Sequence, residues 1–116
     1  MSIEQRDVVD FIGTDEANNT VILTISDHLD WDDTENHLLL LQDKINTYLS
    51  FYESGEIYET YPQATGRQII IDIIGKYPLH TMGENFLAEA NKTIQDMGVK
   101  IQFIQFEFLR PQNGIK

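Results

Sequence analysis

The segment Gln-Ile-Ile-Ile-Asp-Ile-Ile at residues 68–74 is apolar at every position except its first and fifth. β-Branched residues favour strands, and an apolar run without alternation is typical of a strand covered on both faces. We therefore predict a central strand at Gln68–Ile74. Because a carboxylate is costly to bury alone, we expect Asp72 to face solvent at the open side of the sheet, or to pair with Lys76, Lys100 or Arg67.

Two further apolar runs lie upstream and predict a β-hairpin. Residues 8–12 are rich in strand-forming side chains. Residues 20–26 alternate, which places Val21, Leu23 and Ile25 on one face of a strand. The polar stretch Gly13–Asn19 predicts the turn between them. Because this stretch is longer than two residues, the type of turn stays open.

A long helix is predicted between the hairpin and the central strand. Asp32 and Glu35 have the spacing of a capping box, with Asp in place of the usual Ser or Thr. Gly55 is the expected end of the helix. The apolar residues between them recur at spacings of three and four, on one helical face: Leu38, Leu41, Ile45, Tyr48, Leu49 and Tyr52. Residues 56–66 are predicted to be a connection.

The chain after the central strand predicts a second helix and a last strand. Pro78 marks a turn, and Gly98 is the expected end of the helix. The apolar residues at helical spacing are Met82, Phe86, Leu87, Ala90, Ile94 and Met97. In the strand predicted at residues 99–109, the apolar positions are odd-numbered as far as Phe103 and even-numbered from Ile104. A one-residue shift inverts the faces of a strand, so we expect a bulge near Phe103 or burial on the second face.

The predicted order is therefore β-β-α-β-α-β, and the predicted fold class is α+β. Four strands and two helices bury their apolar faces together as a mixed sheet with both helices packed on one face. Residues 1–116 form one domain of ordinary size, with residues 110–116 expected to be a loose tail. Neither the order of the strands nor the oligomeric state follows from the pattern alone.

The charge is unevenly distributed along the chain. Nineteen acidic and 8 basic residues give a net charge of −11. Residues 1–58 carry the whole excess, with 13 acidic residues against Arg6 and Lys44. Nucleic-acid binding uses clustered Lys and Arg, so we expect no nucleic acid as a partner and consider a basic protein instead. Acidity that merely keeps the protein in solution is the simpler explanation.

The composition also excludes several classes of protein. There is no cysteine, which excludes disulfide scaffolds, thiol nucleophiles and cysteine-based metal sites. No run of 18 apolar residues is present, so we expect no membrane span. The first residues lack the basic start and apolar stretch of a signal peptide, and we expect a cytoplasmic protein. No cofactor is indicated.

Residues 26–37 hold the densest group of ionisable side chains, with five carboxylates and two histidines. Their spacing matches neither an EF-hand loop nor a His-Glu-x-x-His zinc site. The simplest explanation is that acidic residues gather at a helix start, where unpaired N–H groups and the helix dipole favour negative charge. The alternatives are a surface that binds a partner and a divalent-metal site.

The candidate partner-binding residues are Asp27, Asp30, Asp32, Asp33, Glu35 and Tyr58. The candidate metal ligands are Asp27, His28, Asp30 and His37. No catalytic residue is identified by spacing. Trp31 is an interface hot spot if exposed, but we expect it to pack over the first turn of the helix against the end of the hairpin.

Three stretches of the chain resemble an uncharacterised family of small acidic bacterial proteins, a domain of unknown function. They are residues 21–31, with His28 and Trp31, residues 37–49, and residues 54–58. The resemblance covers most of residues 7–104. It implies a stand-alone bacterial domain without an assigned activity, so it transfers no catalytic residue.

These observations support three hypotheses about function. The first is a non-enzymatic acidic domain that binds a basic protein, such as an immunity protein or inhibitor of a nuclease toxin. The second is a metal-binding or hydrolytic domain that uses the segment Asp27–His37. The third is a structural homodimer joined through Ile104, Phe106 and Phe108, if the last strand lies at a sheet edge.

Overall fold

The computed structural model describes Ile3, Val9 and residues 11–105. The strands are β1 (Phe11–Asp15), β2 (Thr20–Asp27), β3 (Gln68–Gly75) and β4 (Val99–Gln105). The α-helices are α1 (Thr34–Glu53), α2 (Glu56–Thr60) and α3 (Thr81–Ile94), with 3₁₀ turns at Pro62–Ala64 and Gln95–Met97. The element order confirms the predicted alternation apart from α2, a third helix within the predicted connection.

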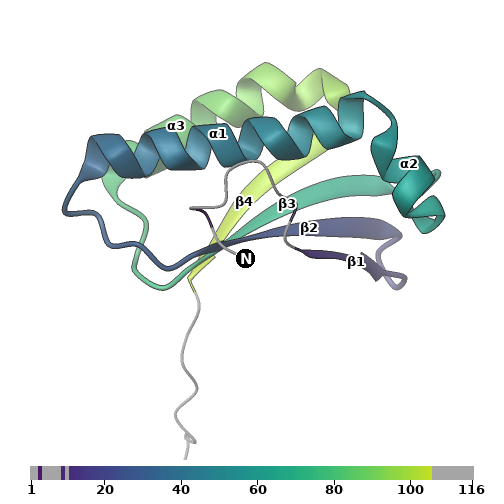
Figure 1. Ribbon diagram of the computed structural model, residues 1–116, viewed down its shortest axis with the longest axis horizontal. Helices are drawn as coiled ribbons and strands as arrows, with labels where there is room; N and C mark the ends of the chain where they lie inside the picture. Colours follow the sequence, from purple (N-terminus) through teal and green to yellow (C-terminus); the bar gives the residue numbers. More distant parts are fainter. Residues whose placement is uncertain (1–2, 4–8, 10, 106–116) are drawn as a thin grey trace, which may run out of the picture.

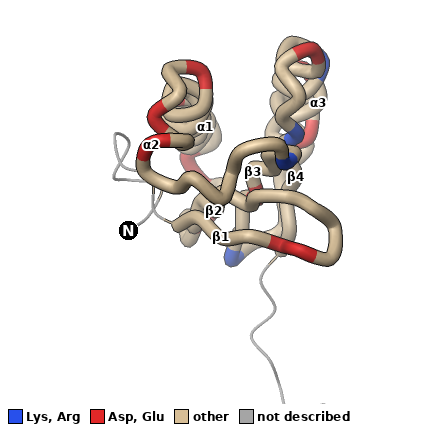
Figure 2. Tube along the Cα trace, turned by 90° about the vertical axis from the view of Figure 1, so that its right-hand side faces the viewer, with Lys and Arg blue, Asp and Glu red and all other residues tan. Residues whose placement is uncertain are grey.

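The four strands form one sheet in the order β1-β2-β3-β4. β1 and β2 are antiparallel, whereas β2, β3 and β4 are parallel to one another, so the predicted mixed sheet is confirmed. Helices α1 and α3 lie side by side over one face of the sheet (Figures 1 and 2). No helix in the described part of the chain is long and apolar enough to cross a membrane.

The core lies between the sheet and the two long helices. Every second residue of β2 and β3 faces it and is buried: Val21, Leu23, Ile25, Ile69, Ile71 and Ile73. α1 contributes Leu41, Ile45 and Tyr48, and the Tyr48 hydroxyl donates a hydrogen bond to the Thr24 carbonyl oxygen, with an O···O distance of 2.5 Å. The strand residues spaced by two and the α1 residues spaced by three or four thus pack together in one apolar layer.

β1 extends further along the chain than the sequence predicts. β1 starts at Phe11 and continues through Gly13 and Asp15, which were assigned to the turn. The connection is only Glu16–Asn19, and Asn19 has a φ of 57°, the left-handed conformation that Asn tolerates. Pairing with the strongly apolar β2 draws this polar stretch into the sheet, because register is set by the partner strand as well as by composition.

α1 begins one residue later than the predicted capping box. Asp33, not Asp32, is the N-cap, and its Oδ1 accepts a hydrogen bond from the Asn36 backbone N–H at 3.3 Å. The Asp32 N–H donates to Asp30 Oδ1 at 3.0 Å, so Asp32 belongs to a local turn before the helix. At the other end, Gly55 is left-handed with a φ of 84°, as expected of a residue that ends a helix.

β4 contains no bulge as far as Gln105. Its register with β3 is continuous from Ile69–Val99 to Gly75–Gln105, so the predicted bulge near Phe103 is wrong in this part. Phe103 packs against the core and Ile104 faces the opposite side with 43% of its surface exposed. Phe106 and Phe108, and the predicted tail, lie outside the described residues.

The central position of β3 is confirmed, but its burial on both faces is not. α1 and α3 cover one face only, and Ile70 and Ile74 on the other face are half-buried. Asp72 lies on this uncovered face, but only 8% of its surface is exposed, so it does not face solvent as one of the two predicted alternatives required. Its partner is none of the three predicted cations, because its Oδ1 accepts a hydrogen bond from Gln102 Nε2 at 2.7 Å.

Candidate functional site

The candidate site lies where β2 and β3 end and α1 and α3 begin. Residues 28–33 lead from β2 into α1, and residues 76–80 lead from β3 into α3. Both loops lie at the same end of the molecule, on the left in Figure 1. Carboxyl ends of parallel strands, facing helix starts, are a frequent location of binding sites in proteins with this arrangement.

A buried Asp–His pair forms the base of this end. His37, in the first turns of α1, has 1% of its surface exposed. Its Nε2 lies 2.6 Å from Oδ2 of Asp27, the last residue of β2, and its Nδ1 lies 2.8 Å from the Asp30 carbonyl oxygen. The second carboxylate oxygen, Asp27 Oδ1, accepts the Leu29 N–H at 3.1 Å. The pair therefore ties α1 to β2 and fixes the loop between them.

The hydrogen bonds of His37 determine where its protons lie. A carbonyl oxygen can only accept, so Nδ1 carries a proton and donates to Asp30. Nε2 then either donates a second proton to the Asp27 carboxylate or accepts one from the carboxylic acid. In both cases one proton lies between Asp27 and His37, and both ring nitrogens are occupied. His37 thus has no lone pair free for a metal ion or for a substrate proton.

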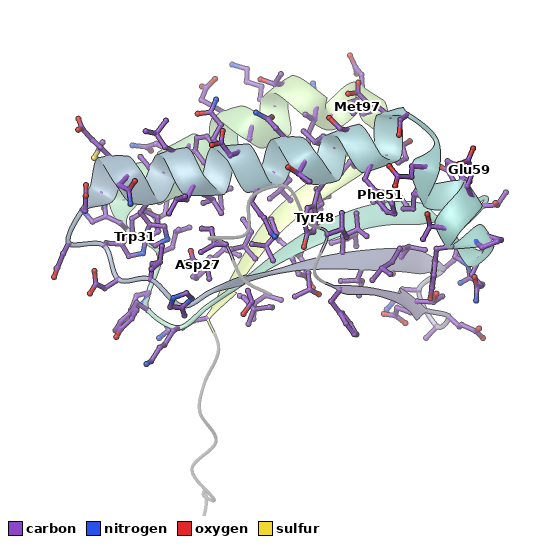
Figure 3. All side chains as sticks on the ribbon, in the orientation of Figure 1. Asp27, Trp31, Tyr48, Phe51, Glu59 and Met97 are labelled. Atoms are coloured by element: carbon purple, nitrogen blue, oxygen red, sulfur yellow. The ribbon has the colours of Figure 1, made fainter. Side chains whose placement is uncertain are left out.

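Trp31 covers this pair. Its ring stacks on the His37 ring with a centroid separation of 3.6 Å and an interplanar angle of 18°. His80 is the N-cap of α3. The centroid of its ring lies 5.9 Å from that of the Trp31 ring, and the two ring planes make an angle of 30°. A Cβ on Gly83 would lie 3.1 Å from Trp31 Cη2, so the glycine allows α3 to approach the indole closely. Trp31 packs between the starts of the two helices, where Figure 3 labels it near Asp27.

Most of the candidate partner-binding residues share one exposed surface. Asp30, Asp32, Asp33 and Glu35 are exposed in the loop before α1 and in its first turn, and we call these four residues the acidic surface. None of the four forms an ion pair with another residue in the part of the chain that is described. Their local roles are modest, since Asp30 and Asp33 each bind one backbone N–H.

Two candidates lie away from the acidic surface. Asp27 is buried under His37 and is not presented to a partner. Tyr58 is exposed, but it belongs to α2, beyond the far end of α1; its neighbour Glu59 is labelled there in Figure 3. Partial desolvation of the phenol, together with the adjoining Tyr52, raises the pKa of Tyr58. The structure therefore separates Tyr58 from the carboxylates with which it was grouped.

The four candidate metal ligands do not converge. Both nitrogens of His37 are occupied, and Asp30 Oδ1 binds the Asp32 N–H. Among residues 11–105 together with Ile3 and Val9, no three His, Cys, Asp or Glu side chains are placed to hold a metal ion. The geometry gives the metal hypothesis no set of ligands within this part of the protein.

Sequence reasoning missed two polar residues of the core. His37 and Lys44 are both buried, and Lys44 Nζ lies 5.7 Å from the centroid of the Tyr48 ring. The sequence contained a signal for the burial of both, since His37, Leu41, Lys44 and Tyr48 follow one another at spacings of four, three and four. That spacing defines one helical face, and the face includes its polar members.

Two open grooves lie outside this end of the molecule. One, of about 750 Å³, runs between β1, the second half of α1 and α2, with Ile12 and Phe51 as apolar walls and Asn46 and Ser50 as polar ones. The other, of about 510 Å³, lies between α3 and β4. Neither is lined by a residue of the acidic surface.

No curated protein and no solved structure shows significant similarity to this sequence. A family of unknown function, DUF6572, matches residues 1–107, which is nearly the whole chain. The match includes the Asp27–His37 pair, Trp31 and the acidic surface, and it assigns no activity to any of them. The resemblance stated from the sequence is therefore confirmed at the level of the family: the chain belongs to the family of unknown function DUF6572.

Proposed function

We propose that the protein is a non-enzymatic binding domain that takes a basic protein partner on its acidic surface. The observation that supports this is the exposure of Asp30, Asp32, Asp33 and Glu35 at one end, without an ion pair among the described residues. Exposed carboxylates of one sign attract a basic surface over roughly 10 Å at moderate salt, and such steering mainly raises the rate of association.

The base under the acidic surface supports the same proposal. Two fixed hydrogen bonds of His37 and the stacked Trp31 hold the loop between β2 and α1. A binding surface on a rigid base loses less conformational entropy when a partner docks. The backbone that carries these carboxylates is thus held at Asp30 and Trp31, which suits a binding surface.

A nuclease toxin is the basic protein that best fits the acidic surface. A nuclease needs a cluster of Lys and Arg to hold phosphates, and an acidic protein that covers the cluster blocks access of the nucleic acid. In this proposal the domain is an immunity protein or inhibitor, and its bound state excludes substrate without any chemistry of its own.

Affinity capture with a matched pair of variants tests the proposal. The first variant, D30N/D32N/D33N, removes three charges from the acidic surface and retains a capping side chain at residue 33, because Asn also caps helices. The second, E53Q/E56Q/E59Q, removes three exposed charges near the opposite end of α1. Both change the net charge equally, so a difference between them reports the place of binding and not the total charge.

Capture from the native host is performed at ~50 mM and ~500 mM salt, where screening of exposed charges differs strongly. We expect the wild-type protein and E53Q/E56Q/E59Q to retain a basic protein at low salt and to release it at high salt. D30N/D32N/D33N, folded by circular dichroism, should retain it weakly or not at all. Three results would contradict the proposal: no basic protein is captured, capture does not depend on salt, or both variants lose the captured protein equally.

A further inference from the structure

The face of the sheet opposite α1 and α3 is covered by no described element (Figures 1 and 2). The register places Phe11, Thr24, Asp72 and Gln102 side by side in one row across all four strands of this face. We call this surface the open face. Thr24, Asp72 and Gln102 make its centre polar, as on an ordinary solvated face, but apolar side chains lie around that centre.

Isoleucines flank the central row of the open face on both sides. Ile22 pairs with Ile70 in the row before it, and Ile74 pairs with Ile104 in the row after it. At the edges, Phe11 on β1 has 60% of its surface exposed, and Ile104 on β4 has 43%. Five apolar side chains thus lie around the polar centre of one uncovered surface, and exposed apolar side chains gathered on one face commonly mark interaction sites.

The polar centre of the open face is incompletely satisfied. Asp72 has only 8% of its surface exposed, yet only its Oδ1 has a hydrogen-bond donor, from Gln102. No donor among the described residues reaches Oδ2. Lys100 is exposed on the same face, one row away beside Ile70, and does not pair with Asp72. A nearly buried carboxylate with an unused oxygen and an exposed ammonium group therefore lie close together on one surface.

We propose that the open face joins two copies of this chain in a symmetric dimer. A two-fold axis brings each residue of one copy against a different residue of the other, so the surface must complement itself. Lys100 of one copy would then donate to Asp72 of the other, twice, between the apolar rows. The pairing satisfies the unused carboxylate oxygen and covers the five apolar side chains in one step.

The distribution of charge favours a second copy over the basic partner at this face. The open face carries Asp72 and Lys100, which cancel, with Asp15 at its margin. Two chains of net charge −11 repel each other, and that repulsion is least where the facing surfaces are close to neutral. Among the described residues, a basic protein finds at most one unbalanced carboxylate here, that of Asp15. The open face and the acidic surface are thus separate, so an experiment can contradict the proposed dimer without contradicting the proposed binding of a basic protein, and the reverse.

The size of the open face sets the expected strength of the dimer. Four strands about 4.8 Å apart, with five, eight, eight and seven residues at about 3.3 Å each, give a footprint of roughly 450 Å² per copy. Interfaces of roughly 1,000 Å² in total are at the low end for specific association. We therefore expect a dimer in reversible equilibrium with the monomer, which dissociates on dilution.

Sedimentation velocity of the full chain at ~10 μM and ~500 μM tests this dimer, because mass action shifts a weak equilibrium over such a range. The mass should rise from the monomer's 13.4 kDa towards twice that value. The double variant F11K/I104K should remain monomeric at both concentrations. The control L39K/M82K changes two exposed apolar residues on the helices to the same charges, and it should dimerise as the wild type does.

A third variant tests the ion pair itself. K100E places two carboxylates against each other across the axis and should weaken the dimer by at least tenfold, whereas K100Q should weaken it less. Added salt should strengthen the wild-type dimer by screening the repulsion of the two acidic chains, which is opposite to its effect on a basic partner. A monomer at both concentrations, or dissociation of L39K/M82K together with F11K/I104K, would overturn the proposal.

Discussion

His37 has a structural role because both of its ring nitrogens are already bound. A histidine that acts in catalysis or in metal binding must offer one nitrogen, and here the Asp30 carbonyl and the Asp27 carboxylate take both. The pair could not be predicted from the sequence, since its members are ten residues apart on a strand and a helix. Only the packing of α1 onto β2 brings them together.

Removal of His37 should therefore unfold the protein more easily. His37→Ala leaves the Asp27 carboxylate buried without its partner, and breaking a buried pair in this way costs about 3–5 kcal/mol. Asp27→Asn should cost less, about 1–2 kcal/mol, because an amide can still donate to Nε2 of a neutral ring. Urea unfolding of the three proteins measures both values. Equal losses in the two variants would contradict the shared-proton arrangement.

Trp31 should matter for stability and not directly for binding. Trp31→Ala removes a half-buried ring that stacks on His37 and touches the start of α3, and we expect a loss of about 3 kcal/mol. Trp31→Phe keeps part of the stack and should lose less. Thermal unfolding measures the loss, and affinity capture of the folded variants tests binding. A Trp31→Ala protein of normal stability that loses its partner would show that the indole is an exposed contact.

At the scale of elements, the long periodic segments were predictable and the short ones were not. α1 and β2 each repeat their apolar pattern often enough to reveal type and buried face, whereas the unbroken apolar run of β3 reveals a strand but wrongly suggests burial on both faces. α2 has five residues, too few for a helical period, and it forms where Gly55 turns the chain left-handed at the end of α1. The second half of β1 was missed because Gly13, Thr14 and Asp15 are not apolar and owe their strand conformation to pairing with β2.

The β1–β2 turn offers a prediction at this scale. The Asn18 side chain donates a hydrogen bond to Asp15 Oδ2 at 2.8 Å, and its N–H lies 3.3 Å from Oδ1. These bonds favour the charged form and lower the pKa of Asp15 from its ordinary value of 3.8. The stabilisation is present above that value and is lost as the pH falls through the lowered one.

Asn18→Ala should raise the pKa of Asp15 by removing the side-chain bond, which is the largest cause of the shift. An NMR titration of the Asp15 carboxyl carbon measures the change. Asn18→Asp serves as a second variant, since a carboxylate at residue 18 accepts but does not donate and adds repulsion, so it should raise the pKa further. An unchanged titration in both variants would rule out the turn as the cause.

At the scale of the whole molecule, the excess of acidic residues acts against folding. A net charge of −11 on one small domain raises the free energy of the compact state through mutual repulsion. An increase in ionic strength from ~10 mM to ~100 mM shortens the Debye length from about 30 Å to about 10 Å and should raise the melting temperature. D30N/D32N/D33N should melt higher than the wild type at low salt and gain less from added salt. Melting curves that do not respond to salt would show that the charges are too far apart to interact.

The order of the strands has a consequence for incomplete chains. Each strand of the sheet pairs with the next one in the sequence, so the sheet can grow during synthesis from β1 towards β4. A chain that stops before Val99 would leave β3 as an edge strand, with five isoleucines and a row of unpaired backbone groups. Apolar exposed edges of this kind promote aggregation. β4 thus protects the protein from self-association into insoluble sheets, and truncated products should be found in aggregates and not in solution.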